Sequence, residues 1–356
     1  MSSHEDQVTV WNQSETLTYI DESRLFISDD VRAIILVINY CVIGVVINTF
    51  GIITNIINLI VFSKMGLKDT VTISLFGLTL SDMCSLLTLL WSGICYNPLF
   101  RYSDIAIESF EVEYITAGAP HVCFTRITGL ITAYITIERC LCIALPLKVK
   151  SLLTPKRTVV IVTLIFVFNI ANVIPAFTVD NLEYKYYPSR NRSLIGLVFQ
   201  AYREKVETYC FASSNFLCYV TFLIVVTCTA VLVFKLNNQR KWRQERSSLE
   251  NAVALVTKDK KVVKMVIIIS GIFIVCYFPM TVVFMGTIAV SEFGLVGRYE
   301  NLYHVICSAG YAFESINSCV SVFIYTKMSS KYKRVFMNFR LRRNTESNEK
   351  AIAKYN

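Results

Sequence analysis

Seven long apolar segments constrain the fold of this chain more than any other feature. They cover roughly residues 34–63, 71–95, 115–143, 158–179, 211–236, 262–290 and 301–325. Each reaches the ~20 residues with which a helix crosses a hydrocarbon core of ~30 Å. Because backbone groups in lipid must be hydrogen-bonded within the segment itself, each is predicted to be a helix. The sequence therefore predicts an all-α membrane protein, a seven-transmembrane helix bundle.

The rest of the chain divides around these segments. Residues 1–33 are predicted to be an extracellular N-terminus, 34–325 the seven-transmembrane domain, and 326–356 a cytoplasmic amphipathic helix and tail. The first 30 residues contain seven acidic side chains and no apolar core, so we expect no cleavable signal peptide. Only 17% of the residues are charged, against ~25% in a typical soluble domain.

Basic residues define the orientation. They cluster between segments one and two, three and four, five and six, and in the tail, and basic loops face the cytoplasm. This places the N-terminus outside and explains the net charge of +9 without a nucleic-acid partner. Two N-x-Ser/Thr sequons, at Asn12 and Asn191, fall on the predicted outer side and are candidate glycosylation sites.

Short motifs inside the segments distinguish between seven-helix architectures. The third segment ends in Glu138-Arg139, followed by Pro146-Leu147. The sixth contains Phe273-Ile-Val-Cys-Tyr277-Phe-Pro279, and the seventh Asn317-Ser318-Cys-Val-Ser321-Val322-Phe-Ile-Tyr325. The first two carry Gly51-x-x-x-Asn55 and Leu78-x-x-x-Asp82. In this order, over roughly residues 34–341, these motifs resemble those of the rhodopsin-like (class A) G-protein-coupled receptors.

Several positions depart from the family pattern. Glu138, Cys140 and Tyr277 stand where the family usually has Asp, Tyr and Trp, and Ser321 and Val322 replace its Asn and Pro. Without that proline, the kink in the seventh helix is expected to be weaker. With these departures the chain looks most like the chemosensory-receptor-like expansions of molluscs. Invertebrate neuropeptide receptors are the next resemblance.

The resemblance implies a coupling switch around Arg139. An arginine in apolar surroundings is costly unless it is paired, and in the resting family members it pairs with an acid at the position of Asp259. Read without the family, Arg139 would be an interfacial anchor that snorkels to the membrane surface. By resemblance, the coupling and switch residues are Glu138, Arg139, Leu147, Asp259, Phe273, Tyr277, Pro279 and Tyr325.

Asp82 lies in mid-membrane, where an unpaired carboxylate is expensive. By resemblance, Asp82, Thr128, Asn317 and Ser318, with Asn55 nearby, form the polar cluster that holds a sodium ion in resting receptors. Oxygen ligands of this kind suit a hard cation. A hydrogen-bonded network with water and no ion is the equal alternative.

The ligand cavity is expected to open outward between segments three, five, six and seven. His121 stands where aminergic receptors have an Asp, and Ser315 where visual opsins have the retinal lysine, so an amine and light are disfavoured. Arg126 and Glu314 are charges within the membrane, and they either pair with each other or leave Arg126 to bind a ligand carboxylate. The candidate pocket residues are His121, Arg126, Tyr277, Phe284, Tyr311 and Glu314.

Two further features complete the expectation. The family ties the third segment to the loop before the fifth through a disulfide, but Tyr114 stands in place of the third-segment Cys. A Cys95–Cys210 disulfide is the predicted substitute, with an unpaired Cys210 as the alternative. After the seventh segment, residues 329–343 place aromatic and basic side chains at helical spacing, which predicts an amphipathic helix on the inner leaflet.

The resemblance implies a plasma-membrane receptor, not an enzyme, that activates heterotrimeric G proteins on binding an extracellular ligand. The ligand is expected to be a chemosensory small molecule, with a neuropeptide as the alternative within receptors. A seven-helix transporter or channel is the alternative from another class, and such proteins are commonly built from internal repeats. Membrane lipid is an expected partner, and no cofactor is expected apart from the sodium ion.

Overall fold

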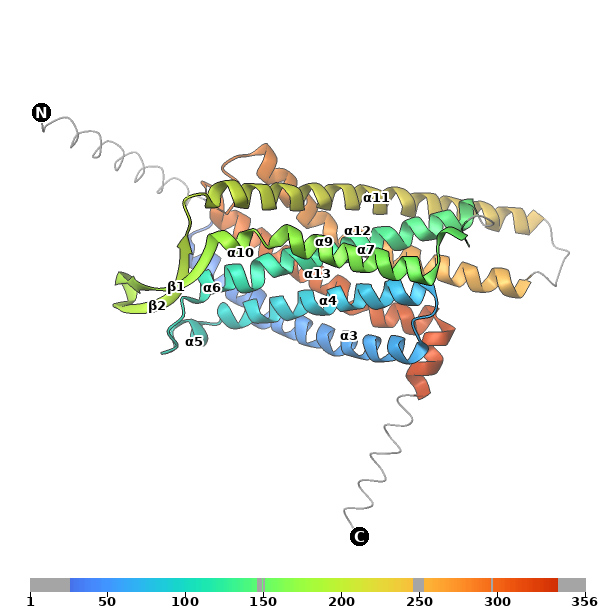
Figure 1. The fold of residues 1–356 in the computed structure, drawn as a ribbon, viewed down its shortest axis with the longest axis horizontal. Helices are drawn as coiled ribbons and strands as arrows, with labels where there is room; N and C mark the ends of the chain where they lie inside the picture. The colour runs from blue at the N-terminus through green and yellow to red at the C-terminus, as the bar shows by residue number, and fades with distance from the viewer. Residues whose placement is uncertain (1–25, 146–148, 150, 246–252, 296, 339–356) are drawn as a thin grey trace, which may run out of the picture.

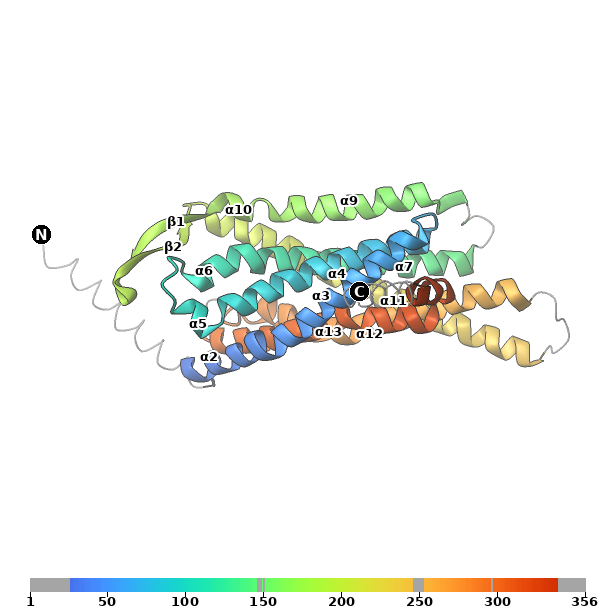
Figure 2. The ribbon, with the colours of Figure 1, turned by 90° about the horizontal axis from the view of Figure 1, so that it is seen from below.

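The computed structural model describes residues 26–145, 149, 151–245, 253–295 and 297–338, with the side chains of 239–260 outside that description. Figures 1 and 2 show an elongated bundle of helices running alongside one another. A β-hairpin lies at one end, which we call the outer end, and the opposite end is the inner end. The predicted residues Asn12 and Leu147, and the side chain of Asp259, lie outside the described residues.

Seven helical units correspond to the seven predicted segments. The first comprises α2 (Asp29–Val37), η1 (Ile38–Gly44) and α3 (Val45–Met65), and the second is α4 (Thr70–Cys95). The third comprises α6 (Ser109–Glu113), η2 (Tyr114–Gly118) and α7 (Ala119–Ala144), and the fourth α9 (Pro155–Val173) with α10 (Ala176–Val179). The last three are α11 (Arg203–Glu245), α12 (Val253–Ala289) and α13 (Glu300–Met328), and a short α5 (Pro98–Arg101) lies in a loop. Six units are long and apolar enough to cross a membrane by length and composition; α13, with 29 residues, is the seventh of the bundle.

Local chemistry explains where these helices begin and break. Asp69 and Thr154 are N-caps whose side chains accept from the backbone N–H groups of Thr72 and Arg157. Such caps satisfy N–H groups that have no partner within the helix. Pro155 follows at a first-turn position, where its fixed φ suits a helix start. Pro175 separates α9 from α10, because a proline cannot continue the hydrogen-bonding pattern of the preceding turn.

The third unit is the centre of the bundle. α7 contacts α4, α9, α11 and α12, whereas α3 packs against α4 and α13. α12 and α13 approach closely at Gly310, where an added Cβ would lie only 2.1 Å from the Met280 sulfur. Side chains on α7 therefore face neighbours from most of the bundle.

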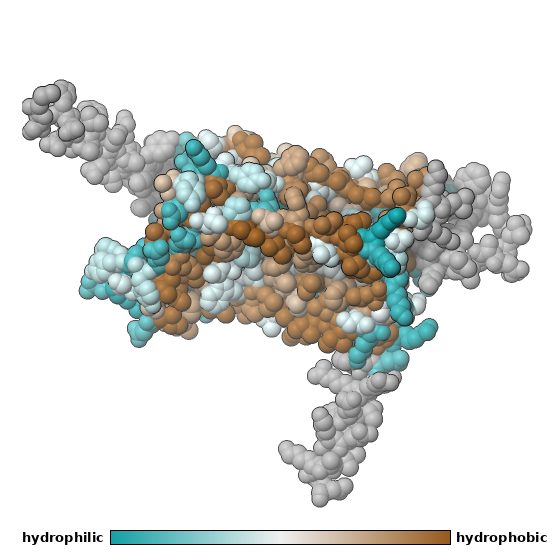
Figure 3. All heavy atoms as spheres, in the orientation of Figure 1, coloured by the Kyte–Doolittle hydropathy of each residue, from teal (hydrophilic) through white to brown (hydrophobic). Residues whose placement is uncertain are grey.

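The outside of the bundle is apolar. Figure 3 shows hydrophobic residues over the middle of the visible face and hydrophilic ones towards its two ends. Val46, Leu164, Leu223 and Val275 are between 59% and 69% exposed, although they lie on four different helices. A large apolar surface of this kind indicates contact with lipid.

A β-hairpin between the fourth and fifth helical units is the main departure from the predicted all-α fold. β1 (Asp180–Tyr187) pairs antiparallel with β2 (Arg192–Phe199), with Asp180 opposite Phe199. The turn η3 (Pro188–Arg190) ends at Asn191, which adopts a left-handed conformation with φ of 48°. Asparagine tolerates this conformation better than most residues. Asn191 is exposed at this turn, so the sequon lies on the surface.

A helical segment follows α13, as the sequence predicts. Residues 330–338 are helical, and the Ser329 hydroxyl accepts from the Tyr332 N–H at 3.2 Å. Tyr332 is fully buried, with its ring 5.4 Å from that of Phe62 and 5.7 Å from that of Tyr325. The remainder of the predicted helix, from residue 339, lies outside the described residues.

Candidate functional site

At the inner end of α7, Arg139 pairs with its neighbour Glu138. The Arg139 Nη2 contacts Glu138 Oε1, and the Thr70 hydroxyl of α4 donates to the same oxygen. The Glu138 side chain is 1% exposed and that of Arg139 12%. Glu138 Oε2 and Arg139 Nε have no hydrogen-bond partner in the described part of the chain. The ion pair lies within α7, and the Thr70 hydrogen bond links its Glu138 oxygen to α4. The predicted Arg139–Asp259 pair stays a prediction.

The other switch residues lie along α12 and α13. The rings of Phe273 and Tyr277 stack with centroids 4.2 Å apart, and Pro279 lies inside α12 just beyond them. Proline removes a helix hydrogen bond, so this position is a natural bend. Tyr325 is 1% exposed and its ring lies 5.1 Å from Phe62 of α3.

Asp82 of α4 is buried in a polar cluster. The Thr128 hydroxyl donates to Asp82 Oδ1 at 2.9 Å, and Ser81 Oγ lies 2.9 Å from Thr128 Oγ1. Asn55 Nδ2 donates to the Ser318 carbonyl at 3.0 Å, while Asn55 Oδ1 is buried without a partner among the described residues. These polar groups come from α3, α4, α7 and α13, and the binding of sodium among them stays a prediction.

A small cavity lies beside Asp82. Its volume open to the centre of a water molecule is about 10 Å³, and its lining includes Asp82, Thr132, Asn317, Ser321 and Tyr325. This is about the room that one water needs. One carboxylate with neutral hydroxyl and amide oxygens fits a hard monovalent cation. In the described part of the chain, no three His, Cys, Asp or Glu side chains gather as a richer metal site would require.

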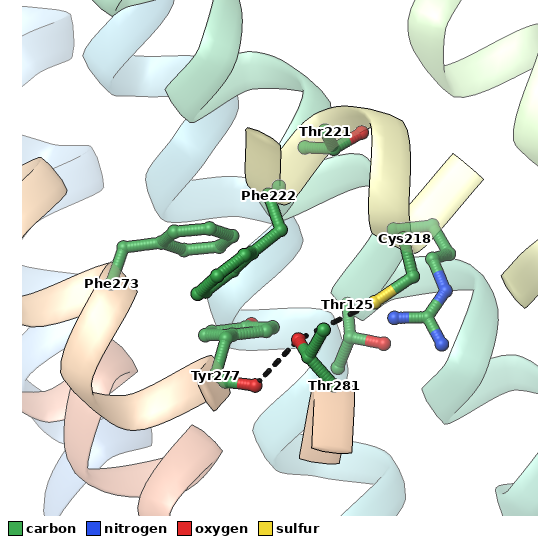
Figure 4. Close-up of a pocket in the computed structure, with 9 residues that line it drawn as sticks. Thr125, Cys218, Thr221, Phe222, Phe273, Tyr277 and Thr281 are labelled. Atoms are coloured by element: carbon green, nitrogen blue, oxygen red, sulfur yellow. Dashed lines mark hydrogen bonds between the residues drawn. The ribbon is translucent and has the colours of Figure 1, made fainter. Parts of the chain in front are cut away.

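A second cavity lies nearer the outer end, between α7, α11 and α12 (Figure 4). It also has about 10 Å³ open to the centre of a water molecule. The rings of Phe222, Phe273 and Tyr277 lie close together on one side of it, with Cys218 and Thr281 beyond them. Its full lining is Thr125, Arg126, Gly129, Cys218, Thr221, Phe222, Phe273, Tyr277 and Thr281. Of the six predicted pocket residues, only Arg126 and Tyr277 line this cavity.

Three other predicted pocket residues, His121 of α7 with Tyr311 and Glu314 of α13, form a separate cluster beside α4. His121 Nε2 lies 2.9 Å from Glu314 Oε2, and both side chains are at least 97% buried. His121 Nδ1 lies 3.1 Å from the Ser85 hydroxyl, and the Tyr311 ring meets the imidazole edge-on at 4.8 Å. The alternative in which Arg126 pairs with Glu314 is therefore wrong, because His121 is the partner of that carboxylate.

Arg126 and the last predicted pocket residue, Phe284, meet each other. The guanidinium carbon lies 5.2 Å from the centre of the Phe284 ring, and Arg126 is 5% exposed. Its Nε has no hydrogen-bond partner in the described part of the chain. A guanidinium over an aromatic face is attracted by the ring, but the ring carries no compensating negative charge.

The hairpin is held over the outer end by a carboxylate. Glu111 Oε2 accepts from the Leu197 N–H at 2.7 Å, the Tyr187 hydroxyl at 2.8 Å and the Lys185 ammonium at 2.8 Å. Burial opposes the charged form of Lys185, but its bonds to Glu111 and Tyr187 outweigh burial, and the pKa of Lys185 is raised. Gly196 packs on this contact, since an added Cβ would lie 1.8 Å from the Tyr187 hydroxyl.

Further contacts join the hairpin to the segment before α6. Arg190 pairs with Glu108 at 3.2 Å, and the backbone N–H of Ile195 donates to the Ala106 carbonyl at 2.8 Å. Glu108 N–H in turn donates to the Ile195 carbonyl at 2.8 Å. The hairpin is thus joined to the third helical unit in three ways. These are the hydrogen bonds to the Glu111 carboxylate, the Arg190–Glu108 ion pair and the backbone hydrogen bonds of Ile195.

The predicted Cys95–Cys210 disulfide is wrong for this structure. All twelve cysteines, each within the described residues, are free thiols. The Cys210 sulfur lies on α11 and donates to the Asn172 carbonyl of α9 at 3.5 Å, whereas Cys95 ends α4.

Sequence reasoning missed two groups of side chains. One is Glu111. It stands three residues before Tyr114, about one helical turn, so the sequence already places its carboxylate at the outer end of the third segment. The other is the buried link from Tyr332 to Asn58 and Ser321. The Tyr332 hydroxyl donates to Asn58 Oδ1 at 2.5 Å, and Asn58 Nδ2 donates to Ser321 Oγ at 3.1 Å.

Comparison with known proteins agrees with this geometry. A family model described as "7 transmembrane receptor (rhodopsin family)" matches residues 54–325. That match covers the inner part of α3 and the second to seventh helical units, with both cavities, and it favours a receptor over the transporter or channel alternative.

Three curated relatives illustrate the similarity. The chain is 24% identical over 294 residues to neuromedin-U receptor 2 of Mus musculus, covering 81% of this chain and 71% of the relative. It is 23% identical over 315 residues to the FMRFamide receptor of Drosophila melanogaster, covering 84% and 54%. It is 23% identical over 300 residues to growth hormone secretagogue receptor type 1 of Mustela putorius furo, covering 80% and 75%. This chain thus spans only about half of the Drosophila relative's length.

Proposed function

This chain belongs to the rhodopsin family of seven-transmembrane receptors, and from that premise we propose that it is a receptor for an extracellular peptide. Binding would activate a heterotrimeric G protein at the inner end, and the chain itself would not be an enzyme. The observation that carries the proposal is the set of relatives, whose names include a neuromedin-U receptor and an FMRFamide receptor. These relatives favour the neuropeptide alternative over the chemosensory small molecule.

The geometry is consistent with ligand binding at the outer end and G-protein activation at the inner end. At the outer end, the hairpin and the tops of the helices form the surface that an extracellular ligand meets first. At the inner end, Glu138 pairs with Arg139 within α7 and accepts a hydrogen bond from Thr70 of α4. A ligand that favours one arrangement of the helices would shift the population of the inner arrangement.

The topology belongs to the same proposal. The basic loops at the inner end favour the cytoplasm, and the chain would be a multi-pass protein of the plasma membrane with its N-terminus outside. Asn12 and Asn191 would then be available for glycosylation, and the helix at 330–338 would lie on the inner leaflet. We also propose that the Asp82 cluster binds sodium in the resting receptor.

The test is a signalling assay in cells that carry a promiscuous Gα, read out as calcium. Amidated peptides, including FMRFamide and neuromedin U, and peptides with a free C-terminal carboxylate are applied beside amino acids and odorants. We expect a response to peptides that is strongly reduced in Arg139→Ala at matched surface expression. A response to small molecules alone would overturn the peptide ligand, and an undiminished response in Arg139→Ala would overturn the role of Arg139.

A paired variant tests the resting arrangement. Asp259→Asn is expected to raise basal signalling if Asp259 restrains Arg139, while the matched variant Asp104→Asn, in the outer loop before α6, leaves it unchanged. Equal basal activity in wild type and Asp259→Asn would remove Asp259 from the switch.

A further inference from the structure

We propose that the cavity between α7, α11 and α12 is an anion site in which Arg126 binds a carboxylate of the ligand. The inference rests on the proposed function for the identity of the ligand, but not for the existence of the site. It begins with a charge balance. Arg126 is 95% buried, and an arginine in such surroundings is expensive unless an anion compensates it.

No side chain in the described part of the chain supplies that anion. Glu314, the acid that the sequence offers as a partner of Arg126, is engaged by His121 at 2.9 Å. Glu138 is engaged by Arg139, and Asp82 accepts from Thr128, so the other buried carboxylates of α4 and α7 are also committed. Arg126 is left with the face of Phe284, and it lines the cavity of Figure 4.

The surroundings of Arg126 contain unused donors and few acceptors. The Tyr219 hydroxyl of α11 is buried without a hydrogen-bond partner in the described residues, and it interacts electrostatically with Arg126. The hydroxyls of Thr125 and Thr281 already donate to the backbone carbonyls of Val122 and Tyr277. Arg126 Nε and the Tyr219 hydroxyl thus both lack a hydrogen-bond partner in the described residues, and an anion beside Arg126 would supply the missing negative charge.

The shape of the cavity and the geometry of the guanidinium favour a carboxylate. Arginine binds a carboxylate through two parallel N–H donors, which gives both affinity and orientation. With about 10 Å³ open to the centre of a water molecule, the cavity favours the smallest anionic group over a ring. Phe222, Phe273 and Tyr277 line one side of it with apolar surface, which strengthens the attraction between buried charges.

The test uses formate as a minimal carboxylate probe. Thermal unfolding of the purified full-length receptor is compared in sodium formate and sodium gluconate at equal sodium and ionic strength, since gluconate is too large for the cavity. We expect formate to raise the midpoint of wild type, because a ligand at ten times its Kd multiplies the folding equilibrium about elevenfold. The same midpoint in both salts for wild type would overturn the site.

Variants assign the effect to Arg126. Arg126→Gln should abolish the formate shift, and Arg126→Lys should weaken formate binding roughly tenfold or more, because an ammonium cannot make the two parallel bonds. The matched control is Arg32→Gln, which removes an outer arginine paired with Glu300 at 3.2 Å and should keep the full shift. A full formate shift in Arg126→Gln would overturn the assignment.

A third salt separates a carboxylate from an inorganic anion. If sodium chloride stabilises wild type more than formate does, the site is a halide site and the carboxylate proposal fails. Formate acting more strongly than chloride supports it. Because this measurement needs neither an agonist nor a G protein, its failure leaves the proposed function standing, and a silent receptor in the calcium assay leaves the anion site standing.

Discussion

Replacing Glu111 by alanine should loosen the β-hairpin from the outer end of the bundle. The change removes one oxygen that accepts three hydrogen bonds, from Leu197, Tyr187 and Lys185. Leu197 is 4% exposed, so its N–H would be left buried without an acceptor, which costs about 1–3 kcal/mol. The Lys185 pair is about one third exposed, and solvent screening limits it to about 0.2–1 kcal/mol.

Together these losses amount to about 1–4 kcal/mol, and the middle of that range, about 2.5 kcal/mol, is roughly a 70-fold increase in the population of the open hairpin. Glu111→Gln keeps an acceptor oxygen and loses only the charge, so it should cost about 1 kcal/mol or less. The expected order of hairpin protection is therefore wild type, then Glu111→Gln, then Glu111→Ala.

Hydrogen–deuterium exchange of the purified receptor measures this opening at the Ile195 amide. That N–H donates to the Ala106 carbonyl, so it reports docking of the hairpin without being one of the deleted bonds. Its exchange rate follows the opening equilibrium. Glu204→Ala, on the exposed part of α11, is the matched control. An Ile195 exchange rate in Glu111→Ala within twofold of wild type would refute the reasoning.

Three further predictions concern the buried polar groups. His121→Ala leaves the Glu314 carboxylate without its partner and should lower the free energy of unfolding by about 3–5 kcal/mol, measured by thermal unfolding. Adding Glu314→Leu should recover part of this loss. A double variant no more stable than His121→Ala contradicts this prediction. Tyr332→Phe leaves Asn58 Oδ1 without its donor, at a cost of about 1–3 kcal/mol. Hydrogen–deuterium exchange of the amides at 330–338 should become faster, and an unchanged exchange rate would show that the hydroxyl is dispensable. Replacing sodium by choline in the buffer should lower the thermal unfolding midpoint of wild type but not that of Asp82→Asn. A wild type whose midpoint does not depend on sodium would support the alternative, a water network around Asp82 without an ion.

The helix bundle was predictable from the sequence because each helix is determined by its own segment of the chain. Each apolar segment satisfies its own backbone hydrogen bonds, so length and hydropathy decide its structure. The hairpin is different, because β1 and β2 are stabilised by each other and by contacts with a distant segment. Tyr184 and Tyr186 of β1 are 70% and 57% exposed, so the strand carries only a weak apolar signal.

The pairing of charges in the outer half was predictable only in part. Arg126 and His121 are five residues apart on α7, which at ~100° per residue places them about 140° apart around the helix. They therefore cannot both face Glu314 of α13. The sequence identifies both as neighbours of the cavity, but only the rotation of α7 within the bundle decides that His121 meets α13 and that Arg126 lies between α11 and α12.

The missing Asn-Pro pair of the seventh helix shows how a local departure is compensated at a distance. Ser321, in place of the Asn, accepts from Asn58 of α3, and Asn58 in turn accepts from Tyr332 beyond the end of α13. All three side chains are at least 94% buried, so neither bond can open without exposing an unsatisfied polar group or admitting water. Any displacement of the inner end of α13 during activation must therefore carry the following helix with it or break this link. The Ser321–Asn58–Tyr332 link thus couples the inner end of α13 to the helix that follows it.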